Sequence, residues 1–295
     1  MLSLFNKFSK SLNSKEITNT TNSLIYQGKK EISIDSLKTI MGLIDLTTLN
    51  ISDTKNRVMD FCLKINRFHD VFPDIPNVAA ICVYPSLVSV AQSYLKSKNV
   101  QIASVAGGFP ASQTFLKIKI REVQLAVKSG ATEVDIVLPV GKFLEKNYSG
   151  TYTEIKEIKA AAGEAKLKVI LETGVLPDFE SVRKAAILAM DAGADFIKTS
   201  TGKVHPAAEP ESFYIMVDAV LDFFHETGKA VGIKPAGGIS TTEEALVYYS
   251  IVKNTLGQKW LNNKFFRIGA SRLANNILFK ICDLSGKTKM SESYF

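Results

Sequence analysis

The chain has 295 residues, of which 46% are hydrophobic and 22% charged, an ordinary composition for a globular protein with one large core. Its formal net charge of +7 comes from Lys and Arg spread along the whole chain, which argues against nucleic acid or a membrane surface as partner and suits a small phosphorylated anion. No run of about 18 apolar residues occurs, which argues against a membrane span. Three cysteines without CxxC spacing indicate reduced residues of a cytosolic protein.

Residues 1–35 differ in composition from the rest of the chain. They are rich in Ser, Asn, Thr and Lys and contain no acidic residue before Glu16. This composition resembles a weak organelle-targeting leader, but the absence of Arg favours a flexible extension or a helix that covers one end of the main domain. We predict an N-terminal extension over 1–35, one domain over 36–285 and a C-terminal tail over 286–295.

From about residue 41, short apolar segments alternate with longer segments of helical period, as in parallel strands joined by crossover helices. The strand segments are almost continuous in apolar residues, which is typical of strands buried on both faces. Eight of them, without a GxGxxG motif after the first, favour a closed (β/α)₈ TIM barrel over an open, doubly wound sheet. The predicted strands are 41–47, 77–84, 101–107, 133–139, 167–173, 194–200, 230–235 and 265–270.

The intervening segments carry helical signals. Apolar residues recur at steps of three and four in one segment, with charged residues between them, so that one stripe faces the barrel. The apolar set is Leu116, Ile120, Val123 and Val127, and the charged set is Lys117, Lys119, Glu122 and Lys128. Helix-start signals occur at Asp53, Pro85-Ser86, Pro177-Asp178 and Thr241 to Glu244, and stop signals at Gly130, Gly193 and Gly228.

Polar residues at the carboxyl ends of barrel strands surround the active site, so they are the candidate functional residues. Two of them are lysines on successive strands, Lys198 and Lys234, where burial and mutual repulsion can leave one amine neutral near pH 7. A neutral amine is the nucleophile for a Schiff base with a carbonyl substrate. Asp135 can balance the remaining charge and carry protons through a water. The five strand-end residues are Asp45, Asp135, Glu172, Lys198 and Lys234.

Turns that contain glycine follow both lysines, at Ser200–Lys203 and Pro235–Ser240, and the last strand ends in GASR at Gly269–Arg272. Small residues let backbone N–H groups approach an anion, and the loops after strands seven and eight form the usual phosphate site of barrel enzymes. We expect a phosphorylated ligand there. Two alternatives stay open: the glycines can serve turn geometry alone, and the lysines can be ordinary ion-paired residues.

The histidines and cysteines give no metal-binding pattern. His69, His205 and His225 lie far apart and have no HxH or HExxH spacing. His205 is near the predicted barrel mouth, but a loop histidine is more often solvated than catalytic. Cys82 ends the second predicted strand, and we interpret it as a packing residue, with a pocket-lining thiol as the alternative.

From about Ile40 to the C-terminus the chain resembles the deoxyribose-phosphate aldolase family. Seven segments carry the resemblance in the family's order, and GADFIKTSTGK is highly specific. They are LIDLTTLN, AAICVYP, EVDIVLP, KVILETG, GADFIKTSTGK, VGIKPAGG and FRIGAS. The resemblance implies reversible cleavage of 2-deoxy-D-ribose 5-phosphate into acetaldehyde and glyceraldehyde 3-phosphate, in deoxynucleoside catabolism.

The resemblance also implies residue roles. Lys198 would form the Schiff base, Lys234 would activate it and Asp135 would relay protons. The residues expected to bind the substrate and its phosphate are Asp45, Thr199, Gly202, Lys203, Gly237, Gly238, Ser271 and Arg272. Family members work without a metal or organic cofactor and are commonly dimers, so we expect a homodimer in the cytoplasm.

The chain departs from the family pattern at two places. Some members have a mobile tail that ends in a tyrosine and assists proton transfer; here Tyr294 is the counterpart, but Phe295 follows it. Close bacterial relatives have an arginine after the double glycine and a second serine after GAS, whereas this chain has Ser240 and Arg272. We infer that the phosphate site has moved its positive charge to the next loop.

Three other functions would use parts of the same residue pattern. Another lysine aldolase, such as a transaldolase-like enzyme, would differ in its donor or acceptor. A non-catalytic barrel that binds sugar phosphates would release no aldehyde product. An isomerase with Asp135 and Glu172 as acid and base would leave the two lysines unexplained.

Overall fold

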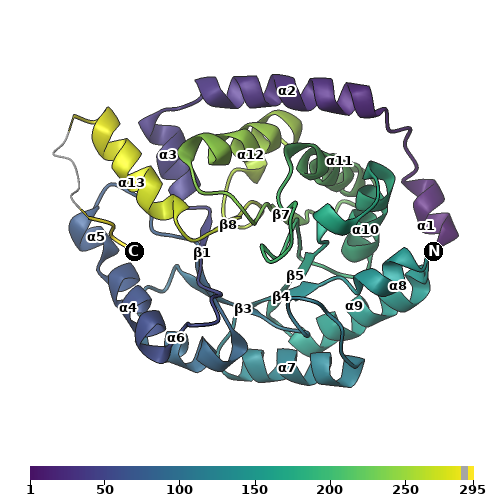
Figure 1. Cartoon of the computed structure of the whole chain (residues 1–295), viewed down its shortest axis with the longest axis horizontal. Coiled ribbons are helices and arrows are strands. Elements are labelled where there is room, and N and C mark those ends of the chain that lie inside the picture. The colour runs from purple at the N-terminus through teal and green to yellow at the C-terminus, as the bar shows by residue number, and fades with distance from the viewer. Residues whose placement is uncertain (287–291) are drawn as a thin grey trace.

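The computed structural model describes residues 1–286 and 292–295 and contains eight parallel strands surrounded by helices (Figure 1). Each strand coincides with one of the eight segments predicted from the sequence, although β5 begins one residue before its segment, and this agreement confirms all eight. Their bounds are β1 Ile44–Thr47, β2 Ala80–Val83, β3 Gln101–Val105, β4 Glu133–Val137, β5 Lys166–Ile170, β6 Phe196–Lys198, β7 Gly232–Lys234 and β8 Ile268–Ala270.

The sheet closes on itself. Neighbouring strands follow chain order from β1 to β7, and β8 pairs with β1. On its other side β8 meets β7 through backbone hydrogen bonds, in which Arg267 N donates to Ile233 O at 3.0 Å and Gly269 N donates to Pro235 O at 2.9 Å. This closure confirms the predicted TIM barrel, because an open doubly wound sheet would leave two unpaired edges.

The crossover helices form the outer ring. Their bounds are α4 Lys55–Asn66, α6 Val88–Tyr94, α7 Leu116–Lys128, α9 Tyr148–Ala162, α10 Phe179–Asp191, α11 Pro210–Thr227, α12 Thr242–Thr255 and α13 Leu273–Leu284. Short helices lie in two of the connections, α5 at Phe68–Val71 and α8 at Val140–Leu144, and three-residue 3₁₀ turns at Pro85–Leu87, Thr173–Val175 and Gln258–Trp260.

Most helix-start signals act as expected. Asp178 accepts a hydrogen bond from Ser181 N at the start of α10, and Thr241 forms a capping box with Glu244 at the start of α12. At α4 the capping residue is Thr54, one residue after the predicted Asp53. Asp53 instead accepts a hydrogen bond from Asn50 N, and so it closes the turn that precedes the helix.

Helix α7 packs with the predicted stripe toward the barrel, since Val123 is buried and Leu116, Ile120 and Val127 pack against the core. One of its charged residues behaves differently from the pattern. Lys119 is only 2% exposed, and its Nζ binds Ser112 Oγ at 2.7 Å and Glu154 Oε1 at 2.5 Å. The helical period cannot reveal this partner, because Glu154 comes from α9.

The N-terminal residues form helices α1 (Leu2–Lys7), α2 (Ser14–Lys30) and α3 (Ile34–Met41). Helix α2 lies along the outside of the barrel, over α11 and α12, and does not cover an end (Figure 1). Phe8 stacks on Phe223 of α11, and Arg183 Nε of α10 donates to Phe8 O at 3.1 Å. The extension is therefore attached to the outer helices.

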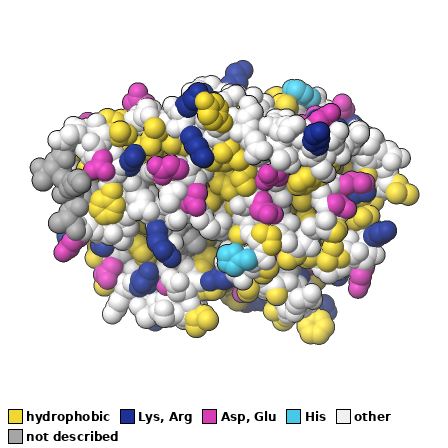
Figure 2. Space-filling view, turned by 45° about the horizontal axis from the view of Figure 1, so that its top comes forward, with side chains coloured by type: hydrophobic (Ala, Val, Ile, Leu, Met, Phe, Trp, Pro, Cys, Tyr) yellow, Lys and Arg dark blue, Asp and Glu magenta, His cyan; other side chains and the backbone are white. Residues whose placement is uncertain are grey.

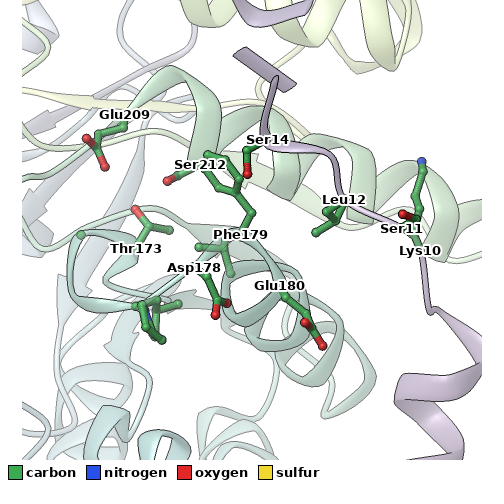
Figure 3. A pocket seen from close by; sticks show the side chains of 14 residues that line it. Lys10, Ser11, Leu12, Ser14, Thr173, Asp178, Phe179, Glu180, Glu209 and Ser212 are labelled. Atoms are coloured by element: carbon green, nitrogen blue, oxygen red, sulfur yellow. The ribbon is translucent and has the colours of Figure 1, made fainter. Parts of the chain in front are cut away.

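The extension also forms one wall of a cavity of about 740 Å³ (Figure 3). The opposite wall consists of the loop between β5 and α10 and the first turn of α11. Thr173, Asp178 and Phe179 come from this loop and α10, Glu209 and Ser212 from the start of α11, and Leu12 from the extension. The lining includes neither of the lysines singled out in the sequence, so the cavity lies beside the barrel interior.

Basic and acidic side chains are interspersed over the face shown in Figure 2, in agreement with their scatter along the sequence. Across residues 1–286 and 292–295, we find no helix long and apolar enough to cross a membrane.

Candidate active site

Seven charged side chains lie inside the barrel, all of them buried. They come from β1, from β4 through β7 and from the residue directly before β8, and they point inward because alternate residues of a strand face the same side of the sheet. The seven residues are Asp45, Glu133, Asp135, Lys168, Lys198, Lys234 and Arg267, each at most 3% exposed.

The two lysines singled out in the sequence lie side by side. In the β6–β7 pairing, Lys198 is directly opposite Lys234, so their side chains leave the sheet at the same height. Asp135 lies opposite Lys168 in the β4–β5 pairing. The register therefore brings three lysines and one aspartate toward the same part of the barrel interior.

Asp135 is the common partner of these three lysines. Its Oδ2 accepts hydrogen bonds from Lys198 Nζ at 3.0 Å and from Lys234 Nζ at 2.9 Å. Its Oδ1 accepts from Lys168 Nζ at 3.0 Å. A carboxylate that accepts several hydrogen bonds from cations stays ionised, so Asp135 fixes the positions of the three amines.

A second set of contacts extends toward β8. Lys234 Nζ donates to Asp45 Oδ2 at 2.5 Å, and Arg267 Nη1 donates to Asp45 Oδ1 at 2.6 Å. Arg267 Nη2 donates to Glu133 Oε1 at 2.8 Å, and Lys168 Nζ donates to Glu133 Oε2 at 2.6 Å. Together these contacts join all seven side chains into one network.

The network distinguishes Lys198 from the other two lysines. Burial lowers the pKa of Lys198, and the charge of Lys234 lowers it further against the opposing effect of Asp135. Burial also favours a lower pKa for Lys234, but Asp135 and Asp45 outweigh it and raise that pKa. Lys168 has a raised pKa for the same reason, since Asp135 and two other carboxylates outweigh its burial. Lys198 is thus the lysine of the three that loses its proton first.

The two aspartates have the opposite shift. Burial acts to raise the pKa of Asp135, but Lys168, Lys234 and Lys198 together hold it well below its usual value. Asp45 also has a lowered pKa, because its neighbouring cations outweigh its burial. Both carboxylates are therefore ionised at neutral pH.

The opposite wall of the barrel interior is apolar. Small side chains from β2 and β3 face inward there, and together with Leu49 they form a separate buried cluster. Its members are Leu49, Ala80, Cys82, Ala103 and Val105. Burial, followed by the charge of Asp135, raises the pKa of Cys82 to about 11, so this thiol is neutral at pH 7. Small residues here leave room for the long lysine side chains opposite.

The loops after β6 and β7 meet at their glycines. Gly202 and Gly237 both have positive φ angles, of 75° and 92°, and a Cβ on Gly237 would lie 2.7 Å from Ala207 Cβ. Only glycine fits this conformation and this spacing. Gly238, with φ of 84°, borders open space, so its backbone is accessible to a ligand.

Polar side chains hold the β6 loop in place. Thr201 donates through both its N and Oγ1 to the Glu172 carboxylate, at 3.0 and 2.6 Å. Thr199 Oγ1 accepts from Ala236 N at 2.9 Å and donates to Ala236 O at 3.1 Å. Glu172 and Thr199 thus hold the loops after β6 and β7 in position. The Thr199 hydroxyl, predicted to bind substrate, is hydrogen-bonded to the backbone of Ala236.

The remaining residues expected to bind phosphate lie around these loops. Lys203 Nζ donates to Leu49 O, across the mouth of the barrel. Ser271 and Arg272 follow β8, and both are exposed at the start of α13. Ser240, which stands where close bacterial relatives have arginine, instead binds Glu244 through its N at 2.8 Å.

The structure does not bring Tyr294 to the lysines. Its ring packs against Phe68 and Phe72 on the outside of the barrel, and its hydroxyl donates to Lys64 O at 2.7 Å. Phe295 stacks on Phe68 and bonds to Asn275 through its backbone. The predicted proton-transfer position for Tyr294 is therefore not adopted here, because the aromatic end of the chain is anchored on α4, α5 and α13. Part of the predicted tail, residues 287–291, lies outside the described residues.

Sequence reasoning missed three members of the network: Glu133, Lys168 and Arg267. Each lies within a predicted strand: Glu133 is two residues before Asp135, Lys168 is four before Glu172, and Arg267 is two before Gly269. Strand alternation gives the signal for Glu133, because a residue two positions before Asp135 faces the same side. For Lys168 and Arg267 the sequence offers no such signal, because a buried charged residue near the start of a strand looks the same in sequence as an exposed one.

Comparisons with known proteins agree with this geometry. The model of the DeoC/LacD family aldolases matches residues 39–253. Human deoxyribose-phosphate aldolase is 43% identical over 262 residues, which are 84% of this chain and 81% of the human protein. The mouse enzyme of the same name is 43% identical over 261 residues, with the same shares. The tetrameric deoxyribose phosphate aldolase from Aeropyrum pernix superposes with a TM-score of 0.66 at 25% identity, over 86% of this chain and 95% of that one.

The buried lysine network, the closed barrel and these matches lead to one conclusion, that the chain belongs to the DeoC/LacD family of aldolases, which are carbon–carbon lyases.

Proposed function

We propose that this aldolase cleaves 2-deoxy-D-ribose 5-phosphate reversibly into acetaldehyde and glyceraldehyde 3-phosphate, through a Schiff base on Lys198. The observation that carries the proposal is the contrast among the three buried lysines. Asp135 and Asp45 keep Lys234 protonated, whereas the pKa of Lys198 is lowered. A neutral amine beside a fixed cation is the arrangement that lysine-based carbonyl chemistry requires.

The reaction starts when the Lys198 amine attacks the C1 aldehyde of the open-chain sugar phosphate. Loss of water from the carbinolamine gives an iminium ion, which acts as the electron sink. The C3 hydroxyl then loses its proton through a water to Asp135, C3 becomes the aldehyde carbon of glyceraldehyde 3-phosphate as the C2–C3 bond breaks, and the electron pair of that bond moves into a C1–C2 enamine on Lys198. Because the pKa of Asp135 is low, this carboxylate passes the proton on and does not store it.

Protonation of the enamine carbon and hydrolysis of the resulting iminium release acetaldehyde and restore Lys198. Lys234 lies against the same Asp135 oxygen as Lys198, so it is the nearest acid that can return the proton. The apolar wall formed by Ala80, Cys82 and Ala103 suits the two-carbon fragment. Apart from its bond to the Lys198 nitrogen, this fragment contains only carbon and hydrogen.

The phosphate would bind at the loops after β6, β7 and β8. Gly202, Gly237 and Gly238 present backbone in conformations that bring N–H groups close to an anion. Lys203 and Arg272 supply positive charge, and Ser271 a hydroxyl. The exposed position of Arg272, next to a Ser240 that is bound to Glu244, supports the inference that the charge has moved from the β7 loop to the β8 loop.

Borohydride trapping tests the Schiff base. Incubation with acetaldehyde and borohydride should leave one ethyl group on the protein, which peptide mapping should place on Lys198, and activity should be lost in parallel. Lys198→Met carries no charge, like the neutral amine, and cannot form the adduct, so it is the matched control. An intact protein mass without any added ethyl group would refute the mechanism.

A substrate panel tests the substrate. Acetaldehyde as the sole donor, together with glyceraldehyde 3-phosphate as acceptor, distinguishes this activity from that of a transaldolase-like enzyme. We further propose a homodimer in the cytoplasm, to be measured by light scattering and by imaging of the tagged full-length chain.

A further inference from the structure

Two charged residues at the base of the network have no part in the reaction as proposed. Arg267 and Glu133 are 2% and 1% exposed and bind one another through Nη2 and Oε1 at 2.8 Å. Neither contacts Lys198 in the hydrogen-bond network. Each instead binds a residue one step closer: Arg267 binds Asp45 at 2.6 Å, and Glu133 binds Lys168 at 2.6 Å.

These two residues complete a charge balance. Apart from Lys198, the network holds three cations, Lys168, Lys234 and Arg267, and three carboxylates, Asp45, Glu133 and Asp135. The other titratable group that faces them is the Cys82 thiol of β2, which is neutral at pH 7. Strand β3 runs from Gln101 to Val105 and contributes no ionisable side chain. The buried network is therefore electrically neutral only when Lys198 carries no proton.

Burying a net charge in a protein interior is costly, whereas a balanced set of paired charges costs far less. We propose that Arg267 and Glu133 are positioning residues that set the protonation of Lys198 from opposite sides: Arg267, through Asp45, favours the neutral amine, and Glu133, through Lys168, offsets that effect so that the network is neutral when the amine is neutral. This inference rests on the proposed Schiff-base function. It assigns to the pair a role in setting the protonation of an amine that neither residue touches.

The proposal predicts opposite effects for the two single substitutions. Arg267→Gln leaves one carboxylate in excess, so protonation of Lys198 becomes favourable and its pKa rises. Glu133→Gln leaves one cation in excess, so the pKa of Lys198 falls. Removal of one charge from a buried network shifts a neighbouring pKa by about one unit or more. The double variant restores neutrality, and Arg267→Lys retains the charge.

The experiment measures reductive trapping of acetaldehyde on Lys198 by intact mass, across pH 5 to about 10, in full-length protein. We expect the midpoint of adduct formation to move to higher pH by about one unit in Arg267→Gln and to lower pH in Glu133→Gln. In the double variant and in Arg267→Lys the midpoint should lie within about 0.3 pH units of the parental midpoint, a difference much smaller than the shift of the single variants. Thermal unfolding measures the stability of each variant. Destabilisation alone would not move the midpoints of Arg267→Gln and Glu133→Gln in opposite directions.

Two outcomes separate the inference from the function on which it rests. If the parent protein forms no adduct at any pH, the Schiff-base function fails. If the parent forms the adduct but Glu133→Gln and Arg267→Gln shift the midpoint in the same direction, or not at all, the charge-balance proposal is overturned. If Arg267→Gln does not fold, the direction of the shift in Glu133→Gln decides alone.

Discussion

Replacing Lys234 with methionine should raise the pKa of Lys198 and reduce catalysis at neutral pH. Because both Nζ atoms bind the same Asp135 oxygen, at 3.0 and 2.9 Å, they can be no more than about 6 Å apart. At an effective dielectric constant of about 20, two unit charges at that distance repel by about 3 kcal/mol, equivalent to about two pKa units. Loss of this repulsion should lower the fraction of neutral Lys198 at pH 7, and with it kcat/KM, by about 100-fold.

The assay is the pH dependence of kcat/KM for cleavage of deoxyribose 5-phosphate. In Lys234→Met the acidic limb should move to higher pH by about two units, and activity should recover partly in alkaline buffer. An acidic limb at the parental pH would refute the electrostatic coupling, even if the rate fell.

Lys119→Met is the matched control for this experiment. Lys119 is also buried and paired with a buried carboxylate, Glu154, but it lies on α7 outside the barrel. Its removal should cost stability of the order expected for breaking a buried pair, about 3–5 kcal/mol. The acidic limb should stay where it is. A shift in this variant would show that the pH profile reports instability and not charge.

Three further predictions concern stability and the ends of the chain. Because the pKa values of Asp45 and Asp135 are lowered in the folded state, the stability they contribute is present above the unfolded value of 3.8 and should be lost as pH falls below it, as measured by urea unfolding from pH 6 to pH 2. Phe8→Ala should destabilise the protein by about 3 kcal/mol in thermal unfolding, since the ring is buried against α11. Tyr294→Phe should cost about 1 kcal/mol through its lost hydrogen bond and leave kcat within about twofold.

Each of these three predictions would be contradicted by a specific result. Constant stability down to pH 2 would mean that the two aspartates are not ionised against the lysines in the folded state. An unchanged melting temperature for Phe8→Ala would separate the extension from the fold. A fall of tenfold or more in kcat for Tyr294→Phe would place that hydroxyl in the proton transfer after all.

The sequence by itself determined the architecture and the two central lysines. Eight apolar strand segments with a helical period between them leave few arrangements, since buried parallel strands require crossover helices and closure removes unpaired edges. Lys198 and Lys234 stood out because each interrupts an apolar strand at its carboxyl end, and in a barrel those ends converge. Asp135 and Asp45 were found by the same reasoning.

Only the tertiary structure decided how the charges are shared. Local patterns do not say which side chain from another strand meets a given one, so the ion pairs that Lys168, Glu133 and Arg267 form became visible only in the folded barrel. The same limit explains Lys119, which the helical period counted as polar surface but whose partner on α9 makes it a buried ion. It also explains Tyr294, whose chain neighbours do not reveal that its ring packs against Phe68 of α5. A pKa depends on the sum of all neighbouring charges and on burial, and both are properties of the folded chain.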